Sequence, residues 1–187
     1  MISVQTKAIE TIYDGYRFRS RLEARWAVFF KALNIYYEYE KEGFDLDNAG
    51  LYLPDFYIPE TNTWIEIKPF GYPDWQARLK CKEFAAQISP IVLFDGDPMK
   101  LMIDNNTFVY WWAKIDIDGD VEIRHVAGMC FSFFLSEELR EFWTWANTWL
   151  SESGVKTSEE EKKFISVLEK LKNACLESRQ ARFDHRS

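Results

Sequence analysis

Two strand-like runs joined by a short polar turn constrain the fold of this 187-residue chain more than any other feature. Leu51–Ile58 and Thr63–Lys68 are rich in aromatic and β-branched residues, and the polar residues 59–62 separate them. This pattern predicts an antiparallel hairpin with a four-residue loop. In that register Asp55 falls directly opposite Glu66.

The predicted hairpin gathers two carboxylates and a lysine on one face. Because residues two apart in a strand point the same way, Glu66 and Lys68 share a face, and Ile65 and Ile67 occupy the other. Facing carboxylates repel unless a cation lies between them, and Mg²⁺ with oxygen ligands fits that place. A lysine beside such a centre can position or deprotonate a water that attacks phosphorus. The pattern favours metal-assisted phosphodiester hydrolysis, and the alternative is a solvated sheet face with no catalytic role.

The remaining hydrophobic pattern predicts helices and strands along the whole chain. Apolar residues at helical spacing, capping residues and the turn dipeptide Asp118-Gly119 mark these elements, and Glu40–Gly50 is expected to be a loop or an irregular edge strand. The expected helices are Ser20–Leu33, Asp74–Gln87, Ser136–Leu150 and Ser158–Leu176, and the further expected strands are Ile35–Tyr39, Ile91–Phe94, Thr107–Ile117, Val121–Val126 and one that reaches Phe134. We expect one domain, with a core at 1–98 and a β-hairpin plus C-terminal helices at 99–187 packed on it.

Charge is distributed unevenly along the chain. The formal net charge of −7 argues against a protein that binds nucleic acid over its whole surface. Arg17–Leu33 holds five basic residues and one acidic residue, and Lys162–Ser187 holds seven basic residues and three acidic ones. Any contact with DNA is therefore expected to be local.

Cysteine spacing and hydropathy place the chain in a reducing, aqueous compartment. Cys81, Cys130 and Cys175 lie far apart and give neither a zinc-ligand spacing nor an even disulfide framework. The N-terminus has no apolar signal core, and no apolar run is long enough to span a bilayer. We expect a cytoplasmic protein with no membrane partner.

Pro54-Asp55 followed by Glu66-Ile67-Lys68, after a helix that carries Glu23, resembles the PD-(D/E)XK nuclease superfamily. The segment RSRLEARWAVFF…YEYE…YLPDFYIP…WIEIKP is similar to small nuclease-like proteins of phages and mobile elements, over about residues 12–98. The resemblance implies an α/β fold with a restriction-endonuclease-like core of helix, three strands, helix and strand, in which helices flank a mixed sheet. A C-terminal β-hairpin and two-helix extension would follow this core.

The resemblance also implies an activity and roles for individual residues. The activity is metal-dependent cleavage of DNA by an endonuclease. Asp55 and Glu66 would bind Mg²⁺ or Mn²⁺, with the Ile67 carbonyl as a further ligand. Lys68 would be the catalytic lysine, and Glu23 would be a supporting acid from the first helix.

Polar residues around this motif have two interpretations each. Ser20-x-x-Glu23 is a capping box, in which Glu23 reaches back to the Ser20 amide, and this role is compatible with a role in the site. Basic and polar residues on the first two helices either contact phosphate or form solvated helix faces. The candidate DNA contacts are Arg19, Arg21, Arg25, Gln76 and Lys80.

Two alternatives keep the fold and change the function. One is a catalytically silent protein that binds a partner protein, for example a phage counter-defence inhibitor, since acidic surfaces can occupy sites meant for DNA. The other is a nuclease subunit that is active only in a complex. The C-terminal helices offer a surface for a second copy of the chain or for a partner protein.

Overall fold

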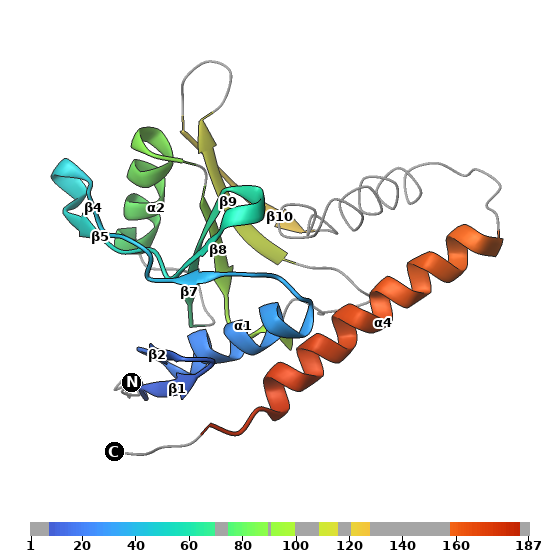
Figure 1. Cartoon of the computed structure of the whole chain (residues 1–187). Helices are drawn as coiled ribbons and strands as arrows, with labels where there is room; N and C mark the ends of the chain where they lie inside the picture. Colours follow the sequence, from blue (N-terminus) through green and yellow to red (C-terminus); the bar gives the residue numbers. More distant parts are fainter. Residues whose placement is uncertain are drawn as a thin grey trace, which may run out of the picture.

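A mixed sheet forms the centre of the fold, which is α/β in class. The computed structural model describes residues 8–69, 75–89, 91–99, 109–115, 121–127 and 158–183 (Figure 1). Six strands are ordered β10, β9, β8, β7, β6, β3; β7 and β8 run parallel, and each other neighbouring pair runs antiparallel. These strands are β3 (Glu38–Tyr39), β6 (Phe56–Ile58), β7 (Thr63–Lys68), β8 (Ile91–Asp95), β9 (Val109–Ile115) and β10 (Val121–Ala127).

Helices cover both faces of this sheet. Figure 1 shows α1 and α4 side by side on one face, and α2 on the other face together with the small hairpin of β4 and β5. Buried side chains of α4 join the core cluster that contains α1, so the C-terminal helix packs on the N-terminal half of the chain. The elements are α1 (Arg21–Ala32), α2 (Trp75–Gln87), α4 (Ser158–Gln180), β4 (Phe44–Asp45) and β5 (Leu51–Tyr52).

Side chains of β7 alternate between the two faces as the sequence predicts. Ile65 and Ile67 are buried in the core beneath α1, whereas Trp64 is buried in the core beneath α2. Glu66 and Lys68 therefore lie on the α2 face. This alternation directs both polar side chains toward the same side of the molecule.

Helix α1 begins at the predicted N-cap, Ser20, and contacts β8 through Trp26. The Oγ of Ser20 accepts a hydrogen bond from the Glu23 amide at 3.2 Å, a cap worth about 1 kcal/mol. Trp26 stacks on Phe94 of β8 with ring centroids 4.2 Å apart, and its Nε1 donates to the Gly96 carbonyl at 2.9 Å. The N-terminus of α1 thereby sits at a defined place relative to β7 and β8.

The predicted hairpin has the predicted register. The turn contains a short 3-10 helix, η2 (Pro59–Thr61), followed by Asn62 in the left-handed region at φ 49°. The paired residues are Ile58 with Thr63, Tyr57 with Trp64 and Phe56 with Ile65. This register is the one that brings Asp55 toward Glu66.

The single strand predicted over Leu51–Ile58 is wrong, because the structure divides it into β5 and β6. β5 pairs with β4 outside the main sheet, whereas β6 pairs with β3 and β7. Pro54 lies in the break, and it lacks the N–H that a continuous ladder requires. The break also changes the facing of Tyr52, which would share the face of Phe56 in a continuous strand but packs in the α2 core instead.

Two further expectations for the N-terminal half need correction. The strand predicted over Ile35–Tyr39 shortens to β3, since Asn34 follows α1 at φ 56° and only the last two residues pair with β6. The expected elements also omit a hairpin that precedes α1. Its strands are β1 (Thr11–Tyr13) and β2 (Tyr16–Phe18), joined by Asp14-Gly15 with φ of 50° and 83°.

The C-terminal part agrees with the sequence where the structure describes it. β9 and β10 pair antiparallel as predicted, and the turn predicted at Asp118-Gly119 lies outside the described residues. α4 begins at the predicted Ser158 and continues beyond Leu176 to Gln180. The helix predicted at Ser136–Leu150 and the strand predicted to reach Phe134 lie outside the described residues. Among the helices that are described, none combines the length and the apolar character needed to cross a membrane.

Candidate functional site

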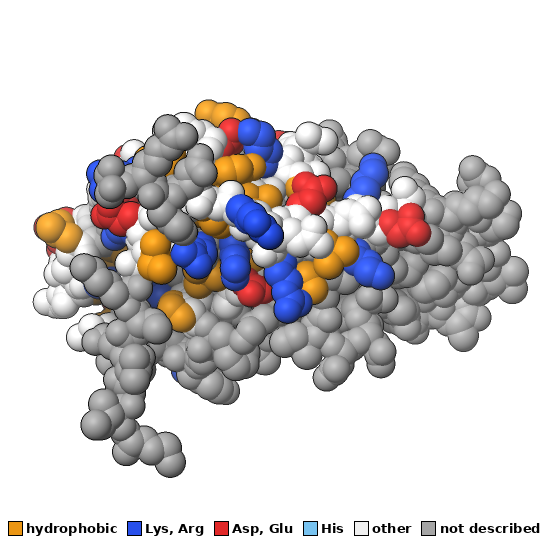
Figure 2. Space-filling model, turned by 90° about the horizontal axis from the view of Figure 1, so that it is seen from below, with side chains coloured by type: hydrophobic (Ala, Val, Ile, Leu, Met, Phe, Trp, Pro, Cys, Tyr) orange, Lys and Arg blue, Asp and Glu red, His pale blue; other side chains and the backbone are white. Residues whose placement is uncertain are grey.

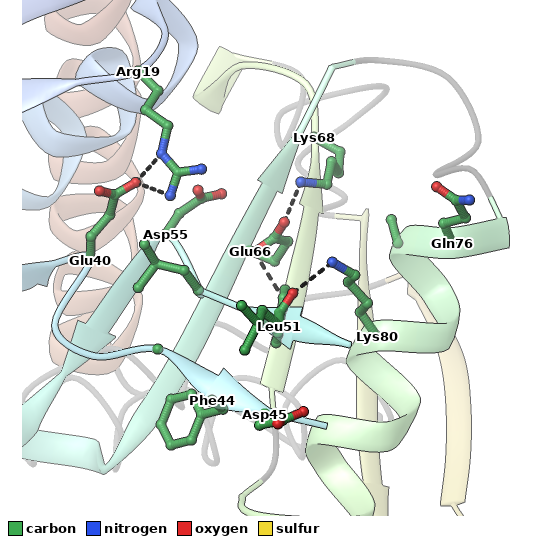
Figure 3. Close-up of a pocket in the computed structure, with 14 residues that line it drawn as sticks. Arg19, Glu40, Phe44, Asp45, Leu51, Asp55, Glu66, Lys68, Gln76 and Lys80 are labelled. Carbon is green, nitrogen blue, oxygen red and sulfur yellow. Dashed lines mark hydrogen bonds and ion pairs between the residues drawn. The ribbon is translucent and has the colours of Figure 1, made fainter. Parts of the chain in front are cut away.

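Most of the predicted site residues line one pocket of about 1010 Å³, which Figure 3 shows in close-up. The pocket lies between the sheet, α2 and the hairpin of β4 and β5. Its predicted site residues are Arg19, Asp55, Glu66, Lys68, Gln76 and Lys80. β4 and β5 add Phe44, Asp45, Leu51 and Tyr52 to its lining.

Asp55 lies in the bend before β6 and is 7% exposed. Its Oδ2 accepts a hydrogen bond from the Ile67 amide at 2.7 Å, and its backbone carbonyl accepts one from the Glu40 amide at 3.0 Å. Burial, followed by the negative charges of Glu66 and Glu23, raises the pKa of Asp55 well above its usual range. Added positive charge in the pocket would therefore stabilise this carboxylate.

Glu66 is 4% exposed, and its two oxygens have different partners. Oε1 forms an ion pair with Lys68, and Oε2 accepts a hydrogen bond from the Tyr52 hydroxyl at 3.0 Å. Burial disfavours the charged lysine, but the Glu66 and Asp55 carboxylates outweigh burial and raise the pKa of Lys68. Lys68 is therefore a cation at neutral pH, placed beside two buried carboxylates.

Glu23 is bound mainly to the segment around the start of α1. Its Oε1 accepts from the Ser20 hydroxyl, and its Oε2 accepts from the Arg19 amide at 3.1 Å and the Tyr39 hydroxyl at 2.5 Å. The reciprocal bond of the predicted capping box thus goes to the Arg19 amide and not to the Ser20 amide. The negative charge of Glu23 still contributes to the raised pKa of Asp55, so Glu23 acts on the pocket electrostatically.

Three of the five candidate DNA contacts lie in the pocket. Two guanidinium nitrogens of Arg19 contact Glu40 Oε1 at one end of it. The Nζ of Lys80 donates to the Leu51 carbonyl at 2.8 Å, and Gln76 is exposed at the far end (Figure 3). These side chains surround the buried carboxylates.

Arg21 and Arg25 lie on α1 but are not among the residues that line this pocket. Arg25 forms an ion pair with Asp97, which follows β8, with a nitrogen–oxygen distance of 3.7 Å. The structure therefore does not bring these two predicted DNA contacts together with the other three.

Two side chains that bind predicted site residues, Tyr52 and Glu40, were not expected from the sequence. Tyr52 reaches Glu66 because the strand predicted over Leu51–Ile58 is broken. In one continuous strand, the Tyr52 side chain would point to the opposite face of the sheet from Glu66. Glu40 falls in a predicted loop, and its partner Arg19 is 21 positions away. No local pattern identifies either contact.

The donor set of the pocket fits a hard divalent cation. Mg²⁺ is commonly bound through one or two carboxylates, with waters and substrate phosphate in the remaining positions. Asp55 and Glu66 offer two carboxylates, and burial followed by the charge of Glu66 raises the pKa of Asp55, so a cation between the two would offset their repulsion. Among the described residues, no group of three or more His, Cys, Asp or Glu side chains is arranged to hold a metal. A metal bound here would depend on non-protein oxygens to complete its shell.

Comparisons of the chain with family models, with curated proteins and with solved structures give no match. A functional assignment must therefore come from the residues and the geometry of the pocket itself.

Proposed function

We propose that this protein is a Mg²⁺- or Mn²⁺-dependent DNA endonuclease, which hydrolyses phosphodiester bonds. The observation that supports this most is the pair of buried carboxylates, Asp55 and Glu66, in one pocket with the cationic Lys68. Neighbouring buried charges of the same sign reduce stability. Carboxyl groups with perturbed pKa values in a cleft are typical of functional sites.

Each residue has one task in the proposed reaction. Asp55 and Glu66 hold the divalent ion, which when bound polarises the phosphate and activates water. Because its pKa is raised, Lys68 keeps its proton at neutral pH. Its ammonium therefore donates hydrogen bonds to the phosphate oxygen on which negative charge develops, and does not act as a base. Glu23 fixes the backbone of Arg19 and so positions that guanidinium at the pocket.

Basic side chains stand among the acidic ones of the pocket, Glu40, Asp45, Asp55 and Glu66, and give a DNA substrate local contacts despite the net charge of −7. Arg19, Lys68 and Lys80 line the pocket. Basic side chains also lie on the opposite face of the sheet, that of α1 and α4, which Figure 2 shows from below the view of Figure 1. Such side chains neutralise phosphates and position the nucleic acid without reading its sequence.

Cleavage of plasmid and branched DNA with Mg²⁺ or Mn²⁺ tests this proposal. We expect the wild type to cut at least one of these substrates and Lys68→Ala to be slower by about 100-fold, as for loss of one donor to a developing oxyanion. Lys41→Ala is the matched control, because Lys41 pairs with Glu38 outside the pocket. Equal rates for wild type and Lys68→Ala contradict the role of Lys68, and the absence of cleavage of every substrate contradicts the proposed function.

A catalytically silent partner-binding protein is the second candidate. The observation that favours it is that Lys68 and Tyr52 already satisfy both oxygens of Glu66 without a metal. Mn²⁺ titration separates the two candidates, since a nuclease should bind Mn²⁺ and lose this binding in Asp55→Asn. A silent protein, which would bind a partner or a second copy through its C-terminal part, gives no reason for that dependence. A subunit that cuts only in a complex would bind Mn²⁺ and cut no DNA alone.

A further inference from the structure

The hydroxyl of Tyr52 contacts the site at a point that the proposed reaction does not use. Tyr52 belongs to β5, outside the six-stranded sheet, and is 7% exposed. Its hydroxyl donates to Glu66 Oε2 at 3.0 Å and lies 3.6 Å from the Sγ of Cys81 on α2. One buried hydroxyl thus connects β5, β7 and α2 at the pocket.

This hydroxyl restricts the orientation of the Glu66 carboxylate. With Oε2 bound to Tyr52, Oε1 is the oxygen that faces Lys68. The terminal torsion of a glutamate side chain otherwise samples a broad range of angles. The hydrogen bond to Oε2 restricts this torsion before any ligand binds, so less side-chain entropy is lost on binding. The ring of Tyr52 packs edge-on against Phe84, with centroids 5.6 Å apart, and this contact holds the hydroxyl in place.

We propose that Tyr52 is a positioning residue of the metal site, whose hydroxyl orients Glu66 so that Oε1 is presented to the divalent cation. This inference rests on the proposed function, in which Glu66 holds that cation. Groups that orient a metal ligand through a hydrogen bond typically contribute 10–100-fold to metal affinity. Tyr52 touches neither the DNA nor the reacting atoms in this scheme, and acts through Glu66 alone.

Mn²⁺ binding to the full-length chain, measured by calorimetry or electron paramagnetic resonance without DNA, tests this role. Tyr52→Phe removes the hydroxyl and keeps the ring that packs on Phe84. Tyr57→Phe is the matched control, because the Tyr57 hydroxyl donates to Asn62 at 2.9 Å in an exposed setting outside the pocket. We expect Tyr52→Phe to weaken Mn²⁺ binding by about 10-fold or more. Tyr57→Phe should stay within about twofold of wild type, since it touches no ligand.

Thermal unfolding in EDTA accompanies each titration, so that binding is compared below the transition of every variant. Loss of affinity in a folded Tyr52→Phe protein supports the positioning role, because a structural role alone would change only the unfolding temperature. Wild-type affinity in Tyr52→Phe, with binding abolished in Asp55→Asn, overturns the inference and leaves the proposed function standing. A wild-type protein that binds no Mn²⁺ overturns both.

Discussion

Asp55→Asn is expected to stabilise the metal-free protein while it abolishes metal binding. The Asp55 carboxylate is buried beside Glu66. Of the two cations near it, Lys68 is paired with Glu66 and Arg19 is paired with Glu40. Asparagine has nearly the same shape, and its amide oxygen can still accept the hydrogen bond that the Ile67 amide donates at 2.7 Å. The substitution therefore removes a buried negative charge and keeps the local geometry.

The expected gain is about 2 kcal/mol at neutral pH. Burial of one ion costs several kcal/mol after relaxation, and the hydrogen bond from Ile67 to the charged carboxylate returns only about 1.5–3 kcal/mol. The neutral Asn keeps a bond worth about 1 kcal/mol without the cost of a buried charge. For a chain of this length, about 2 kcal/mol corresponds to a rise in Tm of about 4–8 °C.

The gain in stability from Asp55→Asn should increase as the pH rises from about 4. The pKa of Asp55 is raised in the folded state, chiefly by burial and then by the charge of Glu66. Below the unfolded-state pKa of about 4, Asp55 is protonated in both states, and the wild type and Asp55→Asn should have similar stability. As the pH rises toward the folded-state pKa, the wild type loses this stability and the difference between the two proteins grows.

Calorimetric unfolding in EDTA between pH 4 and pH 8 measures this difference. Asp45→Asn is the matched control, because Asp45 is an exposed aspartate of the same pocket and its substitution should change stability by less than about 0.5 kcal/mol. Added Mn²⁺ should raise the Tm of the wild type and not that of Asp55→Asn. A lower Tm for Asp55→Asn, or a difference that does not change with pH, refutes the electrostatic explanation.

Three further predictions concern charge and capping around the pocket. Arg19→Ala should weaken DNA binding in EDTA and lower the salt slope by about 1, whereas Arg25→Ala should change neither, as filter binding over a salt series will show. Lys68→Met leaves the Glu66 carboxylate without its ion pair and should lower the free energy of unfolding in EDTA by about 1 kcal/mol, because about a third of the Lys68 side chain is exposed. Calorimetry measures this loss, and an unchanged Tm contradicts it. Ser20→Ala removes the N-cap of α1 and should cost about 1 kcal/mol in urea unfolding, and a loss below about 0.3 kcal/mol would show that the cap is not needed.

Elements whose signals are local could be predicted from the sequence. The cap at Ser20 and the apolar stripe behind it located α1, and the polar turn at 59–62 located β7 and fixed the register of its hairpin. Asp14-Gly15 is an equally local signal, and it would have revealed the hairpin of β1 and β2 had the short runs on either side been taken as strands.

The details of the site depend on contacts that no local pattern encodes. Pro54 indicated that the predicted strand could be interrupted, but only the pairing of β5 with β4 places Tyr52 on the face of Glu66. The capping box predicts a hydrogen bond from the Ser20 amide to the Glu23 carboxylate. In the structure the carboxylate accepts instead from the Arg19 amide and from the hydroxyl of Tyr39, which is 16 positions away. Tertiary packing decides such choices, because each of these side chains has several acceptable partners nearby.

Crystals of the protein soaked in Mn²⁺ at neutral pH give the most direct test of the central claim, that the Asp55 and Glu66 carboxylates together hold a divalent cation. We predict an anomalous difference peak in the pocket, within about 2.0–2.3 Å of a carboxylate oxygen from each residue. The same soak of Asp55→Asn crystals should give no peak at this place. A wild-type pocket without a peak at millimolar Mn²⁺, or a peak that contacts neither carboxylate, would contradict the account.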